Sequence, residues 1–577
     1  MASITALTLL ASTVINLSLA DSVPRGLAWS SKTYGPDGPW YAVTVELGTP
    51  AQSLDLFPGG FWQSNVLSTS LCNTTSQPCY ASAAGLYNSA NSVSAGSLSE
   101  TGDVSNSTFA DKGMLSLFGS GDYVFDTASI VTEDPPSASV NYPFFDMLVI
   151  SEGYEMLPDG TKYAIEVGNM ALGAPQVNQS WNDGDGGLFN SSLVPSYLYL
   201  TTQVPSNSFG MHIGSTALSI PPSLYIGGYD QSRVLGAVTV QDYNMHYFPI
   251  DLLDIGIGVA EGASPFPFDS KSGLLASGNS SVGVAMQVIV DPIAPFLYLP
   301  KSTCDAIAAN LPVTYQPNLG LYFWDTGSAA YGPIISSPAF LSFTFRLNSS
   351  ITQNMTINVP FAILNLTLTP PLVAKPTQYF PCNAGFSYGK SYGEPTLGKA
   401  FLQAAFVGVN WGLTGQGSWF LAQAPGPNTP SQAMVREIGV DDRFVLASEN
   451  VWADTWRGTW TVIQGAEGNS SANSTTEGGA AGAVESKSRG LSKETVIGVA
   501  VGAVIVTILC VVAADLWRRS RMRRREAGTR GKEMDSPMGY QPAEMHACLQ
   551  RPWELADEQV KRTMELDGER EKAELPG

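Results

Sequence analysis

Asp291 lies inside an apolar, β-branched stretch of the chain and is the first candidate for chemistry. The segment MQVIVDPIAPFLYLP, residues 286–300, is apolar on both sides of this aspartate. Val and Ile favour a strand, and Pro292 and Pro295 prevent a helix from continuing, so we expect Asp291 where a buried strand breaks into a tight loop. A carboxylate there is costly to bury unless it is hydrogen-bonded or does chemistry. It either caps its own turn or is one member of a catalytic pair, which requires a second carboxylate.

The composition favours a body built mainly from β-strands. Of the 577 residues, 44% are hydrophobic and 14% are charged, and 57 Gly and 38 Pro separate many short apolar runs. The net charge of −20 lies entirely before Asp515, because 13 basic and 13 acidic residues balance from there to the end. Such an acidic surface repels nucleic acid, so we exclude nucleic acid as a partner.

Hydrophobic segments near both ends predict a single-pass type I membrane protein. Residues 1–20 resemble a secretory signal peptide. Residues 496–514 hold no charge over about 28 Å of helix, so we expect one transmembrane helix over 495–517. Six arginines follow it, and by the positive-inside rule residues 518–577 form a cytoplasmic tail with the N-terminus outside. The tail is highly charged and expected to be disordered.

Cysteines and glycosylation sequons agree with an extracytoplasmic body. Four cysteines precede the span and allow three connectivities, of which we favour Cys72–Cys79 together with Cys304–Cys382. Ten Asn-x-Ser/Thr sequons are expected to carry glycans. They are Asn73, Asn106, Asn178, Asn190, Asn279, Asn348, Asn354, Asn365, Asn469 and Asn473.

Several motifs resemble the pepsin-like aspartic peptidases (peptidase A1 family). A strand over 40–47, the turn GTPAQ at 48–52 and a strand over 54–57 resemble the opening hairpin of that family. Later motifs keep the family's order: GDYVFDT at 121–127, SNSF at 206–209, LYIGGYD at 224–230, VIVD at 288–291, YLP at 298–300, LGKAFL at 397–402 and FVGVN at 406–410. The resemblance covers about residues 36–425. It implies a first lobe of about 36–235 and a second of about 236–425, with a long cleft between them.

The family resemblance implies a catalytic aspartate from each lobe, but only one remains in this chain. Two close carboxylates share a proton, so that the ionised one activates water while the protonated one donates to the scissile carbonyl. Counting from Gly48 places the first catalytic position at Gly59, and a slip of two residues either way leaves it within 57–61, where no residue is acidic. Asp55 is the nearest carboxylate, but it would require a four-residue slip. Asp291 keeps the second position.

Two further departures weaken the site. The family's Thr-Gly-Thr after the second aspartate is replaced by Pro-Ile-Ala at 292–294. Proline removes a backbone donor, and isoleucine is bulky where glycine allows close approach. The family's flap tyrosine is also missing, because its position falls near Met114 and Leu115.

Other candidate residues favour structural roles. Asp325 begins a literal DTGS at 325–328, but it lies in the same predicted lobe as Asp291, so we expect a turn rather than a catalytic loop. The only histidines before the span are His212 and His246, and no metal-ligand spacing surrounds them. We therefore expect no metal and no cofactor.

Residues 426–494 are expected to form a linker and a glycosylated stalk. The segment from 465 to 490 is rich in Gly, Ser, Ala and Thr. Before it, Trp452, Trp456 and Trp460 recur every four residues, and packing on the body is the favoured interpretation.

The sequence predicts a mainly β, two-lobed pepsin-like fold with one transmembrane helix and a disordered tail. The expected function is that of a membrane-anchored pseudopeptidase that binds polypeptide or glycan without cleaving it. One alternative is an active aspartic-type endopeptidase, and another is a sensor or adhesion receptor that acts through a cytosolic partner of the tail. The resemblance points to a fungal cell surface or secretory-pathway membrane.

Overall fold

The computed structural model describes most of the chain between residues 22 and 464. The described ranges are 22–72, 78–104, 117–133, 139–182, 188–244, 247–348, 351–384, 394–413, 415–430 and 432–464. The predicted signal peptide, transmembrane helix and tail lie outside them, as do Asn73, Asn106, Met114, Leu115, His246, Asn469 and Asn473. Within these ranges, no helix has both the length and the apolar character needed to cross a membrane.

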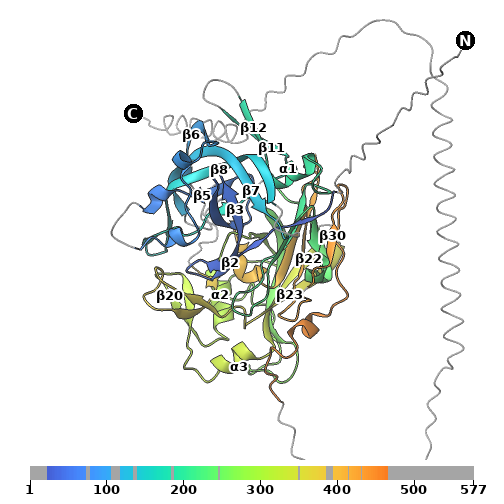
Figure 1. The fold of residues 1–577 in the computed structure, drawn as a ribbon. Coiled ribbons are helices and arrows are strands. Elements are labelled where there is room, and N and C mark those ends of the chain that lie inside the picture. The colour runs from blue at the N-terminus through green and yellow to red at the C-terminus, as the bar shows by residue number, and fades with distance from the viewer. Residues whose placement is uncertain are drawn as a thin grey trace, which may run out of the picture. The chain divides into compact units, whose positions relative to one another are not determined.

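A nine-stranded sheet forms the first lobe, drawn in blue to cyan in Figure 1. Alternating apolar residues bury one face of its strands; the 40–47 strand, for example, buries Val43, Val45 and Leu47. The strands in spatial order are β2 (Trp29–Tyr34), β3 (Trp40–Leu47), β4 (Gln52–Pro58), β10 (Asn169–Met170), β5 (Ser64–Leu67), β8 (Ser139–Met156), β7 (Leu117–Val131) and β6 (Gly96–Val104), with β9 (Lys162–Ala164) paired to β8. The mainly β prediction is confirmed.

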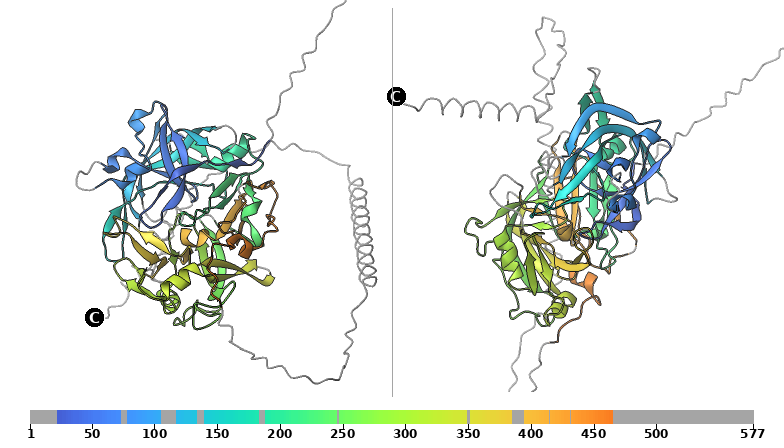
Figure 2. Two further views of the ribbon diagram at one scale, coloured as in Figure 1. Left: turned by 60° about the horizontal axis from the view of Figure 1, so that its bottom comes forward. Right: turned by 90° about the vertical axis from the view of Figure 1, so that its left-hand side faces the viewer.

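The second lobe is built on two sheets, shown in green and yellow on the opposite side from the first lobe in both views of Figure 2. The seven-stranded sheet runs β23 (Ile351–Pro360), β22 (Ala339–Asn348), β17 (Phe248–Val259), β18 (Met286–Val290), β27 (Thr396–Leu397), β19 (Leu297–Tyr298) and β26 (Cys382–Asn383). The four-stranded sheet runs β20 (Val313–Gln316), β21 (Leu321–Trp324), β25 (Thr377–Phe380) and β24 (Leu366–Leu368).

A six-stranded sheet joins the two halves of the chain. Its order is β1 (Arg25–Gly26), β14 (Ser223–Ile226), β13 (Ser208–His212), β28 (Ala405–Asn410), β29 (Ser418–Gln423) and β16 (Leu235–Gln241). Phe61 packs against Phe248 and Trp411 at ring-centroid distances of 4.8 and 5.1 Å, and all three are buried. The two lobes therefore share a continuous aromatic core at their junction.

Helices are short and few in the described residues. They are α1 (Val194–Leu200), α2 (Lys301–Ala308), α3 (Tyr331–Ser336) and α4 (Lys399–Leu402), with the 3₁₀ turns η1 (Thr69–Cys72), η2 (Tyr80–Ala83), η3 (Ser89–Asn91), η4 (Gln231–Arg233) and η5 (Trp452–Trp456). Two two-stranded ribbons complete the body: β11 (Asn178–Asn182) with β12 (Leu188–Ser192), and β15 (Gly228–Asp230) with β30 (Val435–Glu437).

The disulfides formed are those predicted. Cys72 is bonded to Cys79, and Cys304 is bonded to Cys382, which ties α2 to β26. Both pairs close loops of the extracytoplasmic body that the sequence predicts, and such bonds restrict the unfolded chain.

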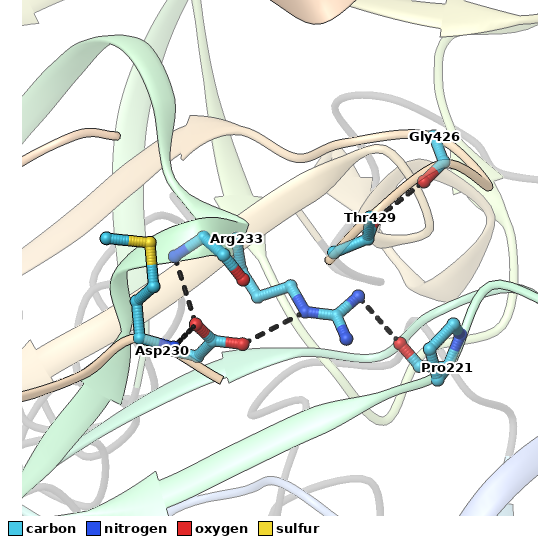
Figure 3. A network of polar contacts seen from close by, with 7 residues as sticks. Pro221, Asp230, Arg233, Gly426 and Thr429 are labelled. Carbon is cyan, nitrogen blue, oxygen red and sulfur yellow. Dashed lines mark hydrogen bonds and ion pairs between the residues drawn. The ribbon is translucent and has the colours of Figure 1, made fainter. Parts of the chain in front are cut away.

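The chain after residue 425 forms an extension that packs on the body. β30 pairs with β15, and the carboxylate of Asp230 accepts hydrogen bonds from Met434 N at 2.9 Å and from Arg233 Nε at 3.3 Å. Figure 3 shows this ion pair, with the Arg233 guanidinium reaching onward to Pro221 O at 2.9 Å. Both charges are almost fully buried, and the Met434 N–H connects the extension to the Asp230 carboxylate.

The tryptophans of the extension confirm the predicted packing. Trp456 and Trp460 are buried, stack at 5.1 Å and lie beside Trp452, whose ring meets Phe340 of β22 edge-on. Gly426 leaves room for the Trp456 indole, because a Cβ there would lie 2.6 Å from the ring. The described part of the predicted 426–494 linker and stalk, which ends at residue 464, is thus packed structure, because these large apolar side chains gain more from burial than from exposure.

Candidate functional site

Two loops at the lobe junction are built in the same way: the first loop follows β4 and begins at Gly59, and the second follows β18 and begins at Asp291. In each lobe, the strand that leads into the loop, β4 or β18, pairs in parallel with a later strand, β10 or β27. The N–H of Gly59 donates to Met170 O at 2.9 Å, and the N–H of Asp291 donates to Leu397 O at 3.2 Å. Each of the two is the first residue after its strand. Gly59 therefore occupies, in the first lobe, the place that Asp291 occupies in the second.

The two loops are in direct contact at Gly59. This glycine has a φ of +149°, and a Cβ built on it would lie 2.9 Å from Pro292 Cβ and 3.0 Å from Ile293 Cδ1. Residues other than glycine rarely adopt this backbone conformation, and Pro292 and Ile293 already fill the space that a Cβ on residue 59 would need. The bulky residues of the second loop thus occupy the side on which a first-lobe side chain would project.

Asp291 is buried, and among the described residues backbone N–H groups and a lysine ammonium act on its carboxyl. It is 7% exposed, and its Oδ1 accepts the N–H of Ile293 at 2.8 Å. Burial raises the pKa of Asp291 to about 6, while the Ile293 and Ala294 backbone N–H groups and the Lys399 ammonium act in the opposite direction. Among the described residues, the charge that acts on this carboxyl is therefore a cation rather than a second anion.

Lys399, which the sequence analysis did not single out, lies at the centre of the junction. It begins α4 and is 6% exposed; its Nζ donates to Ile293 O at 2.9 Å and lies 3.9 Å from the centroid of the Phe57 ring. Burial lowers the pKa of Lys399 to about 8, against the fields of Asp37, Asp291 and Glu155. The lysine thus connects the second loop to strand β4 of the first lobe through a hydrogen bond and a cation–π contact.

The equivalent position in the first lobe holds an ordinary core residue. Leu172 lies two residues past Met170, just as Lys399 lies two residues past Leu397, and Leu172 is fully buried. A signal for Lys399 was present in the sequence, since it is a lone cation in the apolar segment LGKAFL. A buried lysine requires nearby acceptors or anions, and this requirement could have drawn attention to it.

Two first-lobe carboxyls, Asp37 and Glu155, act on this cation at longer range, and both also act on Glu166. Burial raises the pKa of Glu155 and of Glu166 to about 7, and burial also raises the pKa of Asp37. The Tyr163 hydroxyl donates to Glu155, and the Trp40 indole donates to Asp37 at 3.1 Å. Lys399 opposes the upward shifts of Asp37 and Glu155, so these groups form one electrostatic cluster around it.

A small hollow borders this cluster. Its cavity volume is ≈ 10 Å³, about the space of one water molecule. The lining residues are Trp29, Trp40, Tyr41, Pro58, Ile213, Gly214, Thr216, Pro292 and Lys399. It is too small for a ligand side chain, so a ligand of this site must bind outside the hollow. Across the described residues, no three His, Cys, Asp or Glu side chains are grouped as a metal site.

Comparison with curated proteins gives one similar relative. The probable aspartic-type endopeptidase opsB of Aspergillus oryzae is 23% identical over 318 residues, which are 54% of this chain and 55% of the relative. The match thus spans little more than half the length of that relative. No family model matches the chain.

This is an aspartic-peptidase-like protein. The resemblance predicted from the sequence is confirmed at that level. Among solved structures, the crystal structure of aspartic proteinase from Irpex lacteus is similar, with 15% identity, 70% of this chain and 98% of that chain covered, and a TM-score of 0.42.

Asp55, the nearest alternative carboxylate in an aspartic-peptidase-like first lobe, is engaged elsewhere. Its oxygens accept hydrogen bonds from Ser30 Oγ at 2.7 Å, from Thr44 Oγ1 at 2.6 Å and from the Tyr34 hydroxyl. These donors lie on β2 and β3, on the side of β4 opposite to β10. Asp55 therefore links three strands of the sheet and does not lie in the first loop.

The literal DTGS segment is a surface turn, as expected. Asp325 is exposed, accepts the N–H of Gly327 at 3.1 Å and receives the Ser328 N–H at its backbone oxygen at 3.0 Å. His212 is fully buried at the end of β13 in the six-stranded sheet, with Nε2 2.9 Å from Gln403 O.

The site therefore offers one carboxyl and one ammonium where an aspartic peptidase needs two carboxyls. Asp291 can act as a base once ionised, but Lys399 is held by Ile293 O on the same loop. Near neutral pH the ammonium favours the ionised form of Asp291 and removes the reason for two acids to share a proton.

Proposed function

We propose that this protein is a membrane-anchored pepsin-like pseudopeptidase of the cell surface or secretory pathway. It keeps the two-loop architecture of an aspartic peptidase and uses the cleft above the loops to bind polypeptide or glycan without cleaving it. The observation that carries the proposal is the equivalence of Gly59 and Asp291 in strand register and backbone hydrogen bonding. A glycine there supplies no acid or base.

The lost carboxyl matters because the reaction needs two proton transfers in opposite directions. One group must take a proton from water while another gives a proton to the carbonyl oxygen. Enzymes lower barriers by roughly 8–23 kcal/mol in total, and one positioned acid or base accounts for about 10²- to 10⁴-fold in rate. The remaining carboxyl, paired with a lysine, cannot perform both transfers.

The test uses purified full-length protein in detergent with a mixed peptide library at acid to neutral pH, read by mass spectrometry. We expect no pepstatin-sensitive cleavage. Reproducible cleavage that Asp291→Asn abolishes and Asp325→Asn leaves intact would overturn the proposal. Asp325 is a matched control, because it is an exposed aspartate of the second lobe outside the site.

The second candidate is an active aspartic-type endopeptidase, supported by the similarity to the probable aspartic-type endopeptidase of Aspergillus oryzae. A carboxyl from the cluster around Lys399, Asp37 or Glu155, would then supply the missing acid. In that case Glu155→Gln or Asp37→Asn would abolish cleavage together with Asp291→Asn. A third possibility, a sensor or adhesion receptor, depends on the tail, and a cell-surface ligand screen with a tail-deleted chain would separate it from the first.

A further inference from the structure

The β11–β12 ribbon of the first lobe has two faces of different character. Along its strands, exposed residues alternate with buried or partly buried ones, as expected for a ribbon that packs on one side only. Trp181 and Ser191 are buried, and their side chains both donate to the buried carboxyl of Asp146. The Phe189 ring stacks on Phe125 of β7 with centroids 4.5 Å apart. This inner face is therefore fixed to the sheet.

The outer face of the ribbon consists of two crossed glycosylation sequons. Asn178 lies directly opposite Ser192, and Ser180 lies directly opposite Asn190. The Ser192 hydroxyl donates to Asn178 Oδ1 at 2.8 Å, and the Ser180 hydroxyl donates to Asn190 Oδ1 at 2.5 Å. Each sequon thus contributes its serine to the asparagine of the other sequon. Both asparagines are exposed on the outer face.

We propose that Asn178 and Asn190 both carry N-linked glycans, which stand side by side on this ribbon. The two asparagines are diagonal neighbours across an antiparallel pair, so their backbones are about 7–8 Å apart. In each modification the bond from asparagine Nδ2 to C1 of the sugar forms. The bond from C1 to a lipid-diphosphate donor breaks, and the amide proton leaves with the diphosphate.

The paired placement follows from the ribbon rather than from sequon number. Its inner face leaves no alternative orientation, because turning the strands over would expose Trp181 and bury four polar outer side chains. The sugars must therefore point away from the body together. The two glycans would cover the outer face of a ribbon that packs against β7 and β8. Their attachment requires the predicted secretory route but does not depend on whether the protein cleaves peptides.

Asn365 provides the contrasting case within the same chain. It also belongs to a sequon, but it is partly buried, and its Nδ2 donates to the Tyr331 hydroxyl at 3.0 Å. A glycan on this nitrogen would break that bond and place sugar inside the second lobe. We therefore expect Asn365 to be unmodified in folded protein.

The experiment uses the full-length chain expressed in a eukaryotic host and purified from membranes. Enzymatic release of N-glycans in ¹⁸O-labelled water converts each modified asparagine to labelled aspartate. No Lys or Arg lies between Lys162 and Arg233, so one tryptic peptide carries both Asn178 and Asn190, and its mass reports double occupancy directly. We expect a doubly labelled peptide and no label at Asn365.

Matched variants separate the sites. Ser180→Ala should remove the label from Asn178 alone, and Ser192→Ala should remove it from Asn190 alone. Ser180→Thr keeps the sequon and a hydroxyl, so it should keep both labels if the protein folds normally. Label at the exposed Asn354 shows that a given preparation was glycosylated. The proposal is overturned if, in such a preparation, the peptide with Asn178 and Asn190 carries one label or none. It is also overturned if Asn365 is labelled as fully as these two asparagines, or if no sequon is labelled at all.

Discussion

The two loops at the lobe junction share a backbone plan but differ in the chemistry of their side chains. In the first loop, Gly59 and the buried Leu172 leave no ionisable group. In the second loop, the corresponding positions are Asp291 and Lys399, and both are buried. The strand pairing is the same in both lobes, while an aspartate follows the paired strand in only one of them.

The shared pairing does not depend on a carboxyl in each loop. The parallel pairing of β4 with β10 and of β18 with β27 depends on backbone groups and on apolar side chains. A lone buried carboxyl in the second loop then requires a counter-charge, and Lys399 supplies it. Lys399 thus places a positive charge near Asp291, whereas Leu172, at the corresponding position of the first lobe, is uncharged.

Gly59→Asp gives the largest expected effect, because it places in the first loop the carboxyl that only the second loop has. The new side chain would meet Pro292 and Ile293 in a backbone conformation unfavourable to non-glycine residues, so we expect the free energy of unfolding to fall by roughly 4 kcal/mol. No peptide cleavage should appear. Denaturant unfolding provides the measurement, with Gly283→Asp as the control, because nothing lies within 4 Å of a Cβ at Gly283. Equal losses for both variants would show that the loops are not tightly packed.

Lys399→Met comes next and removes the counter-charge. The ammonium lowers the pKa of the buried Asp291 from a distance, so without it we expect the free energy of unfolding to fall by up to roughly 3 kcal/mol at pH 7.5. The loss should shrink at pH 5, because Asp291 with a pKa of about 6 is then mostly protonated. Lys301→Met is the matched control, since Lys301 is an exposed lysine of α2. A loss independent of pH would mean that Lys399 acts by packing alone.

Asp291→Asn tests how the buried carboxyl itself affects the pH dependence of stability. The pKa of Asp291 is raised from 3.8 to about 6, so between these values the folded protein binds more protons than the unfolded chain. This contribution to stability is present below pH 4 and is lost as the pH rises to 6, in total about 3 kcal/mol. Asparagine does not titrate. The variant should therefore gain up to that amount relative to wild type between pH 4 and 7, measured by thermal or denaturant unfolding, and parallel pH profiles would contradict the assignment.

Asp325→Asn should have the smallest effect. The side chain is exposed and only orders a turn, which asparagine also does well, so the change in unfolding free energy should stay within about 0.5 kcal/mol. Cleft binding should be unaffected. An effect as large as that of Asp291→Asn would show that the literal DTGS segment has a role beyond the turn.

The sequence allowed the fold to be predicted where local patterns dominate. Alternating apolar runs located β3 and β4, the turn of residues 48–52 located their connection, and cysteine spacing favoured the pairing that formed. The sequence also showed that neither residue 59 nor its neighbours from 57 to 61 are acidic. Lys399, Glu155 and Asp37 were missed, because their proximity arises from three-dimensional packing between segments more than one hundred residues apart. Packing of the Trp452, Trp456 and Trp460 segment on the body was predicted from its spacing, but the partners in that packing could not be, because they lie far away in the sequence.

The way in which the extension ends determines how the body would carry mechanical load. Thr461 N donates to Ser336 O at 2.8 Å, and Ala263 N donates to Ile463 O at 2.8 Å. A pull on the chain at residue 464 would first stress these two hydrogen bonds and then the stacked indoles of Trp456 and Trp460. Only afterwards would it reach β30 and the buried ion pair of Asp230. Tension would thus be absorbed along the second lobe in stages, and the two loops at the junction would keep their geometry until the extension had peeled away.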